Sequence, residues 1–224
     1  VSVSLAATGT GNGIVQPTGV TDGNGIITGR FTSTVAGSKT VTATAGSETL
    51  AQQATITVTA AAVSAAQSTV SATPASIVAG TTDSTEVTVT ARDAFGNAIA
   101  GATVVLGVTG GSGNTAVQPS ATTNAAGVAV GYVRSTGAGA KTITATINGT
   151  AVTQTAAVTV TAAGVSATTS TISVASATIS AGVGSTNVTV TARDAFSNPI
   201  AGATVVIAAT GSDNTITQPG VTAA

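Results

Sequence analysis

VTVTARDAFGNAIAGATVVL stands at residues 87–106, and VTVTARDAFSNPIAGATVVI returns at residues 188–207, 101 positions later. A second element recurs with nearly the same spacing: LAATGTGNGIVQP, LGVTGGSGNTAVQP and IAATGSDNTITQP begin at positions 5, 106 and 207. A period of about one hundred residues corresponds to one small domain per repeat. The sequence therefore predicts a tandem array of domains.

The register of the repeats divides the 224 residues into three parts. Residues 1–62 are predicted to be the C-terminal part of one repeat, residues 63–162 a complete repeat, and residues 163–224 the N-terminal part of the next. The first and last 22 residues encode the same strand, which disfavours head-to-tail joining of complementary halves, so we expect an interior stretch of a longer chain. No flexible linker separates the repeats, which predicts a stiff rod.

The composition favours β-structure and excludes several partners. Aromatic residues make up 2% of the chain and charged residues 6%, and Ala, Thr, Val, Ser and Gly dominate. Thr and Val suit strands, and no stretch shows a helical period. No apolar run approaches the roughly 20 residues of a membrane-spanning helix. Six Lys and Arg residues and a net charge of −1 supply no basic patch, so nucleic acid is not an expected partner.

The complete repeat contains seven segments with strand-like alternation, separated by Gly- and Asn-rich turns. Seven short strands in about one hundred residues indicate a β-sandwich. The predicted strands are residues 69–73, 86–93, 102–108, 115–118, 128–135, 141–147 and 151–161.

The quoted element contains a turn that follows an alternating strand. Alternation with period two places Val87 and Val89 on one face, which we expect to be core. Asp93 ends the strand, where a carboxylate can accept backbone N–H groups of the next turn. We predict that Asp93 and Asn97 lock this turn and that Phe95 covers the end of the core. The predicted structural turn motif in its two copies is Asp93, Phe95, Asn97, Gly101, Asp194, Phe196, Asn198 and Gly202.

This order of strand, Asp, Gly-Asn turn, Gly and second apolar strand resembles the bacterial immunoglobulin-like group 1 domain, the invasin/intimin-type repeat. The resemblance continues in TNAAGVAV at 123–130 and GAKTITAT at 139–146. The first repeat keeps it as TDGNG at 21–25 and GSKTVTAT at 37–44. The resemblance implies an all-β fold of tandem immunoglobulin-like β-sandwich domains in an elongated array.

Two substitutions distinguish the copies of the turn. Ser197 stands where the earlier copy has Gly96, and Pro199 stands where it has Ala98. We expect neither to threaten the fold. The scarcity of aromatic residues predicts a light core and modest stability per domain, because each buried Val contributes only about 1.5–3 kcal/mol.

The residue types predict no catalytic residue, no cofactor and no metal site. Without His or Cys, neither a Ser-His-Asp catalytic triad nor a Cys-His catalytic dyad can form. The acids do not form the converging pair that a carboxylate hydrolase needs, and no Gly-rich loop has more than one, whereas Ca²⁺ sites recruit several. We therefore do not expect an enzyme. The acids are Asp22, Glu48, Asp83, Glu86, Asp93, Asp194 and Asp213.

Threonine recurs at every second position in strands such as residues 40–44 and 142–146. This pattern could form a flat hydroxyl ladder for ice or polysaccharide, or simply the exposed face of a strand. We favour the exposed strand face, since a twisted sandwich presents no long flat lattice. The N-glycosylation patterns at Asn148 and Asn187 are expected by chance in so Thr-rich a chain.

Sheet edges are normally protected by charge or Pro, and a net charge near zero favours association. Such protection is almost absent from this sequence. We therefore hypothesise that the sides of the rod are covered, either by lateral self-association with sibling chains into fibres or by an O-linked glycan coat. Neighbouring repeats of the same chain are the other expected partners.

Three classes of function are compared: a structural spacer, a binding module and an enzyme. The resemblance implies a bacterial adhesin stalk or extracellular filament, located outside the cell or on its surface. A stiff repetitive spacer needs only the features described above. The alternative, an adhesive module recognising glycan or a host receptor, would need an exposed aromatic platform, and we expect Phe95 and Phe196 to be committed to the core.

Overall fold

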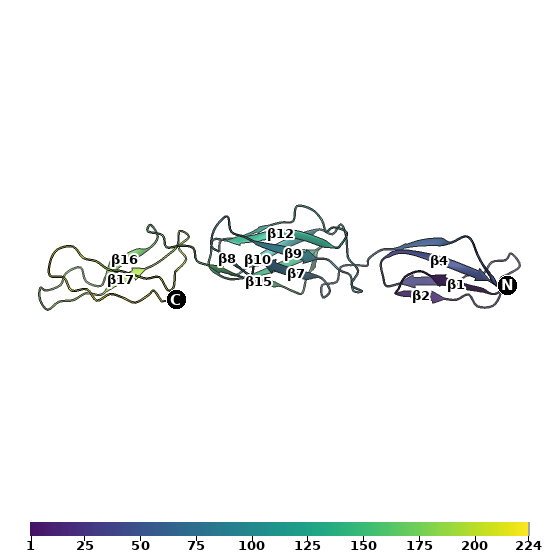
Figure 1. The fold of residues 1–224 in the computed structure, drawn as a ribbon, viewed down its shortest axis with the longest axis horizontal. Coiled ribbons are helices and arrows are strands. Elements are labelled where there is room, and N and C mark those ends of the chain that lie inside the picture. The colour runs from purple at the N-terminus through teal and green to yellow at the C-terminus, as the bar shows by residue number, and fades with distance from the viewer. Residues whose placement is uncertain (224) are drawn as a thin grey trace.

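The computed structural model describes residues 1–223, and the regular structure in these residues is β-strand. We call residues 1–62, 63–162 and 163–224 the first, middle and last unit. The three units follow one another along a single long axis, so the molecule is a rod (Figure 1). Within the described residues, no helix is long and apolar enough to cross a membrane.

The middle unit is a sandwich of two sheets. The strand order is β10-β13-β15-β8 in one sheet, with the short β14 paired to β13, and β11-β12-β9-β7 in the other. All pairs are antiparallel except β15 with β8. The strands are β7 (Thr69–Thr73), β8 (Ser76–Val78), β9 (Thr85–Thr90), β10 (Val104–Thr109), β11 (Asn114–Val117), β12 (Val128–Ser135), β13 (Gly139–Ile147), β14 (Thr150–Ala151) and β15 (Ala156–Thr161).

Seven strands were predicted for this unit, and two differences stand out. Strand β8 was not predicted: the chain leaves β7 at Thr73, passes Pro74 and enters the opposite sheet, where β8 pairs in parallel with β15. The predicted segment 151–161 is interrupted, because only its first residue lies in β14 and β15 begins at Ala156.

The core lies between the two sheets and consists of aliphatic side chains. Val87, Val89 and Ala91 are fully buried, which confirms the prediction that this face of the strand is core. They pack in one cluster with residues of the opposite sheet, including Ile143 and Ile147. Among the described residues, no aromatic side chain belongs to the buried set. The core is therefore light, as the composition predicted.

The first unit repeats the later strands of the middle unit. One sheet contains β1, β4, β5 and β6, in the places of β10, β13, β14 and β15, and β2 pairs with β3 as β11 pairs with β12. The strands are β1 (Val3–Ala7), β2 (Asn12–Val15), β3 (Arg30–Ser33), β4 (Gly37–Ala45), β5 (Glu48–Thr49) and β6 (Ala54–Val58).

The last unit repeats the earlier strands. Strands β16 (Thr171–Val174) and β17 (Val188–Thr191) pair as β7 and β9 do. The described residues 163–223 contain no counterparts of β12, β13 and β15. Val205 and Ile207 are therefore only half-buried, whereas the matching Val104 and Leu106 are buried.

Candidate functional site: the junction between units

The turn after β9 is organised by one buried carboxylate. Asp93 is 0% exposed. Its Oδ1 accepts hydrogen bonds from the backbone N–H groups of Phe95 and Asn97, both at 2.9 Å. Its Oδ2 accepts one from Asn97 Nδ2 at 2.8 Å. Gly96, with φ of +84°, supplies the left-handed residue that closes the turn.

The same two side chains reach across to the preceding unit. Asn97 Nδ2 donates to Thr34 O at 2.9 Å, and Asn97 Oδ1 accepts from the N–H of Ala36 at 2.9 Å. Asp93 Oδ2 also accepts from the N–H of Ala61, in the connecting segment, at 2.9 Å. We call this set of contacts the junction clamp. It ties the turn of one unit to both the end loop and the connecting segment of the unit before it.

The second junction contains the same clamp. Asn198 donates to Thr136 O and accepts from the N–H of Ala138, both at 2.8 Å. Asp194 Oδ2 accepts from the N–H of Ala163 at 3.0 Å and from Asn198 Nδ2 at 2.6 Å. The two junctions are therefore stabilised by equivalent bonds, 101 or 102 residues apart in the sequence.

The two remaining pairs of predicted motif residues lie elsewhere. Gly101 and Gly202 are not part of the clamp. They precede β10 and the matching residues 205–207, and their φ angles of +74° and +76° favour glycine. The prediction that Phe95 and Phe196 belong to the core is wrong, because they are 62% and 42% exposed. Val63 and Ile99 instead pack against the core near this turn.

Strand β13, which follows the loop that receives the second clamp, contains a buried lysine that sequence reasoning missed. Lys141 is 2% exposed, and its Nζ donates to Gly110 O at 2.6 Å. In the loop before β13, Ser135 Oγ accepts a hydrogen bond from the N–H of Gly137 at 3.1 Å. Gly137 lies between Thr136 and Ala138, the two residues of this loop that bond to Asn198. Strand alternation was the available signal, since Lys141 shares the inward parity of Ile143.

The clamp also sets the ionisation of its carboxylates. Burial by itself raises the pKa of Asp93, but hydrogen bonds from the Asn97 side chain and from the N–H groups of Ala61, Asn97 and Phe95 outweigh it and lower the pKa below its usual value of 3.8. Burial and the matching hydrogen bonds have the same net effect on the pKa of Asp194. Both carboxylates therefore favour the charged form in the folded chain.

The lowered pKa of Asp93 predicts that the middle unit loses stability in acid. A carboxylate whose folded-state pKa is lowered contributes stability above its unfolded pKa, and that contribution is lost as the pH falls through the folded pKa. The urea midpoint of the middle unit should therefore be level near neutral pH and fall as the pH drops from about 4 towards 2. Asp93→Asn should already have the lower midpoint at neutral pH and show a flatter profile. A wild-type midpoint unchanged at about pH 2 would contradict this assignment.

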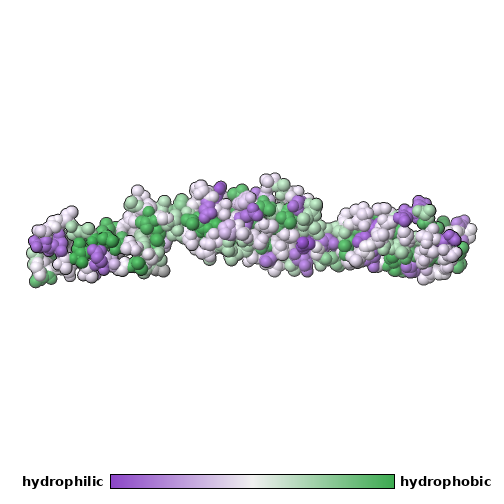
Figure 2. Space-filling view, in the orientation of Figure 1, coloured by the Kyte–Doolittle hydropathy of each residue, from purple (hydrophilic) through white to green (hydrophobic). Residues whose placement is uncertain are grey.

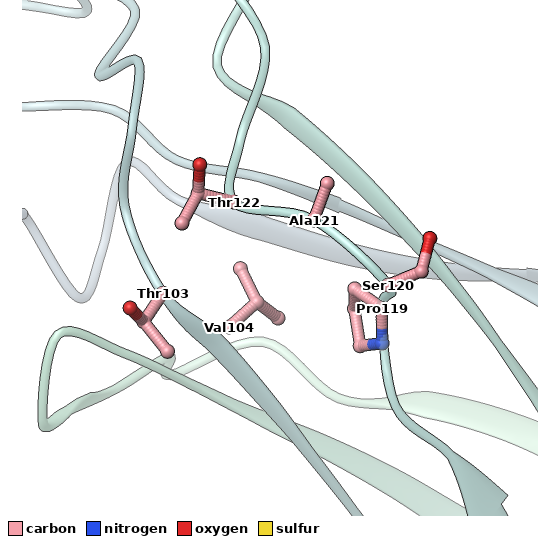
Figure 3. A pocket seen from close by; sticks show the side chains of 6 residues that line it. All are labelled: Thr103, Val104, Pro119, Ser120, Ala121 and Thr122. Carbon is pink, nitrogen blue, oxygen red and sulfur yellow. The ribbon is translucent and has the colours of Figure 1, made fainter.

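The rest of the described surface contains little chemistry. No group of three or more His, Cys, Asp and Glu among residues 1–223 is placed to hold a metal ion. A groove of about 230 Å³ lies beside the start of β10 (Figure 3). Its lining has no titratable side chain and consists of Thr103, Val104, Pro119, Ser120, Ala121 and Thr122. The chemistry at the junctions is hydrogen bonding that holds backbone groups of adjacent units in place.

The two facing sheets of the middle unit, with the chain crossing from one sheet to the other at Pro74, define an immunoglobulin-like sandwich. The first and last units repeat parts of it. Residues 64–163 match the protein-family model described as Invasin, domain 3. The middle unit is thus an invasin-type immunoglobulin-like domain. No curated protein matches the sequence.

Three solved structures show the same fold over most of the chain. FdeC, an Escherichia coli adhesin, is 30% identical with a TM-score of 0.63, and the match covers 88% of this chain and 63% of that one. InvD of Yersinia pseudotuberculosis is 20% identical with a TM-score of 0.59 (90% and 62% covered), and invasin, a bacterial integrin-binding protein, is 21% identical with a TM-score of 0.56 (91% and 48% covered). This chain spans less than two thirds of each of these three.

Proposed function

We propose that this chain is a non-enzymatic, stiff spacer in the stalk of a bacterial surface adhesin or extracellular filament, with residues 1–62, 63–162 and 163–224 as its repeats. Its action is mechanical: each unit adds length, and each junction keeps the units in line. The partner of each unit is the neighbouring unit of the same chain.

The junction clamp is the observation that carries this proposal. A flexible connection would leave the connecting segment and the end loops free, whereas here Asp93 and Asn97 bind three backbone groups of the preceding unit. A buried carboxylate and an amide make charge-assisted and directional bonds, which restrict orientation as well as distance. The repetition of the clamp at Asp194 and Asn198 supports the same geometry at successive junctions.

The relatives support a place outside the cell. FdeC is an adhesin and invasin an integrin-binding protein by their own descriptions. An adhesin needs its binding region held away from the surface that carries it, and a chain of rigid units meets that need. We therefore place this chain outside the cell or on its surface.

An adhesive binding module is the alternative, and the exposed aromatic residues favour it. Phe95, Phe196 and Tyr132 all face solvent, and exposed aromatic side chains are common at binding surfaces. Glycan and receptor binding assays on the intact chain distinguish the two functions. A spacer should show no saturable binding of any glycan or receptor tested. Saturable binding that Phe95→Ser abolishes would favour the binding module.

The spacer proposal predicts that the junctions bend when the clamp is removed. In the double variant Asn97→Ala, Asn198→Ala, the bonds to Thr34, Ala36, Thr136 and Ala138 are lost. Small-angle scattering should then show a shorter mean length and a broader distance distribution than the wild type.

Asn124→Ala is the matched control for this variant. Asn124 Oδ1 accepts the N–H groups of Ala126 and Val128 in a turn within the middle unit, so its loss removes comparable bonds without touching a junction. The control should scatter as the wild type does. Identical scattering from the double variant would refute the clamp as the source of stiffness.

A further inference from the structure

A glutamine side chain occupies the outer edge of β10. Leu106 N–H donates to Gln118 Oε1 at 2.7 Å, and Gln118 Nε2 donates to Leu106 O at 2.9 Å. A primary amide therefore makes the two bonds that a residue of an adjacent strand would make. The same pair of bonds joins Gln16 to Leu5, at 2.7 Å each, and Gln218 to Ile207, at 2.8 Å each.

The register of the sheet shows which backbone groups this amide covers. In an antiparallel pair, alternate residues direct their N–H and C=O groups away from the partner strand. Leu106 lies opposite Ala145 of β13, but its backbone N–H and C=O groups point away from β13 and bond to Gln118. By the same alternation, the backbone N–H and C=O groups of Val104 and Val108 also point away from β13. Gln118 thus occupies the middle one of the three outward positions of β10.

A second contact protects the beginning of this edge. The N–H of Ala102 donates to Thr123 Oγ1, and the N–H of Thr123 donates to Ala102 O, both at 2.9 Å. Between the two blocked positions, Val104 borders the groove of Figure 3, and residues 119–122 run along its other side. Of the three residues whose backbone groups point outward here, Ala102 and Leu106 are already bonded, and only Val104 between them is open. An added strand could therefore not pair with two of these residues in succession.

The residue after Gln118 limits the conformation of its backbone. The residue before a proline is restricted to extended conformations, so Pro119 limits the backbone of Gln118. Pro119 in turn packs over Gly131 of β12, where an added Cβ would lie 3.2 Å from Pro119 Cδ and 2.6 Å from Val117 O. The Gln-Pro pair and the facing glycine recur in the first unit as Gln16-Pro17 and Gly29.

The sequence of β10, VVLGVT, explains why such protection is needed. It contains no charged residue and no proline, the usual protection of an exposed edge. The face shown in Figure 2 is mostly pale, with hydrophobic patches and scattered hydrophilic residues. An identical antiparallel edge from a second copy of this chain would offer matching donors and acceptors in a two-fold arrangement.

We propose that Gln118, with its counterparts Gln16 and Gln218, is a neutral gatekeeper that prevents a second copy of this chain from pairing along the edge of β10. The side-chain amide satisfies the backbone that a second strand would otherwise satisfy. This device takes the place of charge in a chain that has little of it.

The test uses the 224-residue chain and three variants, followed by sedimentation velocity across a wide concentration range. Gln118→Ala should associate at concentrations at which the wild type is still monomeric. Gln118→Glu keeps the acceptor for Leu106 N–H and adds a negative charge, so it should remain monomeric. Gln154→Ala removes an exposed glutamine elsewhere in the middle unit and should also remain monomeric.

Amide hydrogen exchange at Leu106 provides a second measurement that does not depend on association. In the monomeric wild type this amide should be protected, and in dilute Gln118→Ala it should exchange about tenfold faster or more, as expected for a lost hydrogen bond. Rapid exchange at Leu106 in the wild type would overturn the proposal. So would a folded Gln118→Ala that stays monomeric at high concentration, or equal association of Gln154→Ala.

Discussion

Asp93→Ala should lower the free energy of unfolding of the middle unit by roughly 3 kcal/mol or more. The substitution removes the acceptor of three backbone N–H groups and of the Asn97 amide. Leaving one buried donor unpaired costs about 1–3 kcal/mol, and water can reach only part of this site because Asp93 is fully buried. The loss should therefore exceed that of a surface substitution several-fold.

Calorimetry of the intact chain measures this effect. At about 4–8 °C per kcal/mol for a domain of this size, the melting temperature of the middle unit should fall by roughly 12 °C or more. Glu48→Ala is the control, since Glu48 is an exposed acid in β5 of the first unit. A loss for Asp93→Ala of less than about 1 kcal/mol, the size of a single ordinary hydrogen bond, would show that the carboxylate does not organise the turn.

Ile143→Ala should destabilise the middle unit by about 2–5 kcal/mol, the usual range for removing a large aliphatic side chain from a core. Ile143 is fully buried, and with Ile147 it is among the largest apolar side chains in the core. No aromatic residue is buried in this unit, so its packing depends on aliphatic side chains such as Ile143. Replacing Ile143 by Ala leaves a cavity among them.

Val105→Ala provides a matched control for the core substitution. Val105 lies on β10 in the same sheet but faces solvent, since the residue is 53% exposed. Urea unfolding should show a change within about 0.5 kcal/mol for Val105→Ala. Similar losses for the two variants would mean that the sandwich interior is not the main source of stability.

Much of the fold could be predicted because the strands alternate clearly and the chain repeats. The face formed by Val87 and Val89 follows from parity alone, and the segment Val128–Ser135 was predicted with its observed bounds. Strand β8 could not be predicted, since it has only three residues and follows Pro74. Its pairing with β15 depends on a contact more than eighty residues away in the sequence.

The junction shows where local reasoning ends. The bonds of Asp93 within its own turn were foreseeable, because carboxylates at strand ends commonly accept from the next turn. The bonds of Asn97 to Thr34 and Ala36 could not be foreseen, since they join two different units. Phe95 was misplaced for a related reason: hydrophobicity suggested burial, but the turn directs this side chain outward while Val63 and Ile99 pack against the core nearby.

The side-chain amides at the edge of β10 were missed from the sequence. The scarcity of charge predicted only that the sides of the rod are covered by sibling chains or glycan. The Gln-Pro pair is visible in the repeat, but its contact with the edge depends on Leu106, twelve residues away. Lateral association and a glycan coat remain predictions for the other surfaces.

The distance across one junction tests the stiff-rod account most directly. The chain contains no cysteine, so Thr55→Cys on β6 and Thr144→Cys on β13 place two spin labels on exposed positions of the first and middle units. Pulsed electron–electron double resonance should give one narrow distance distribution in this doubly labelled chain. The distribution should become broad when Asn97→Ala is added. A broad distribution with Asn97 in place would contradict the claim that the clamp makes the array rigid.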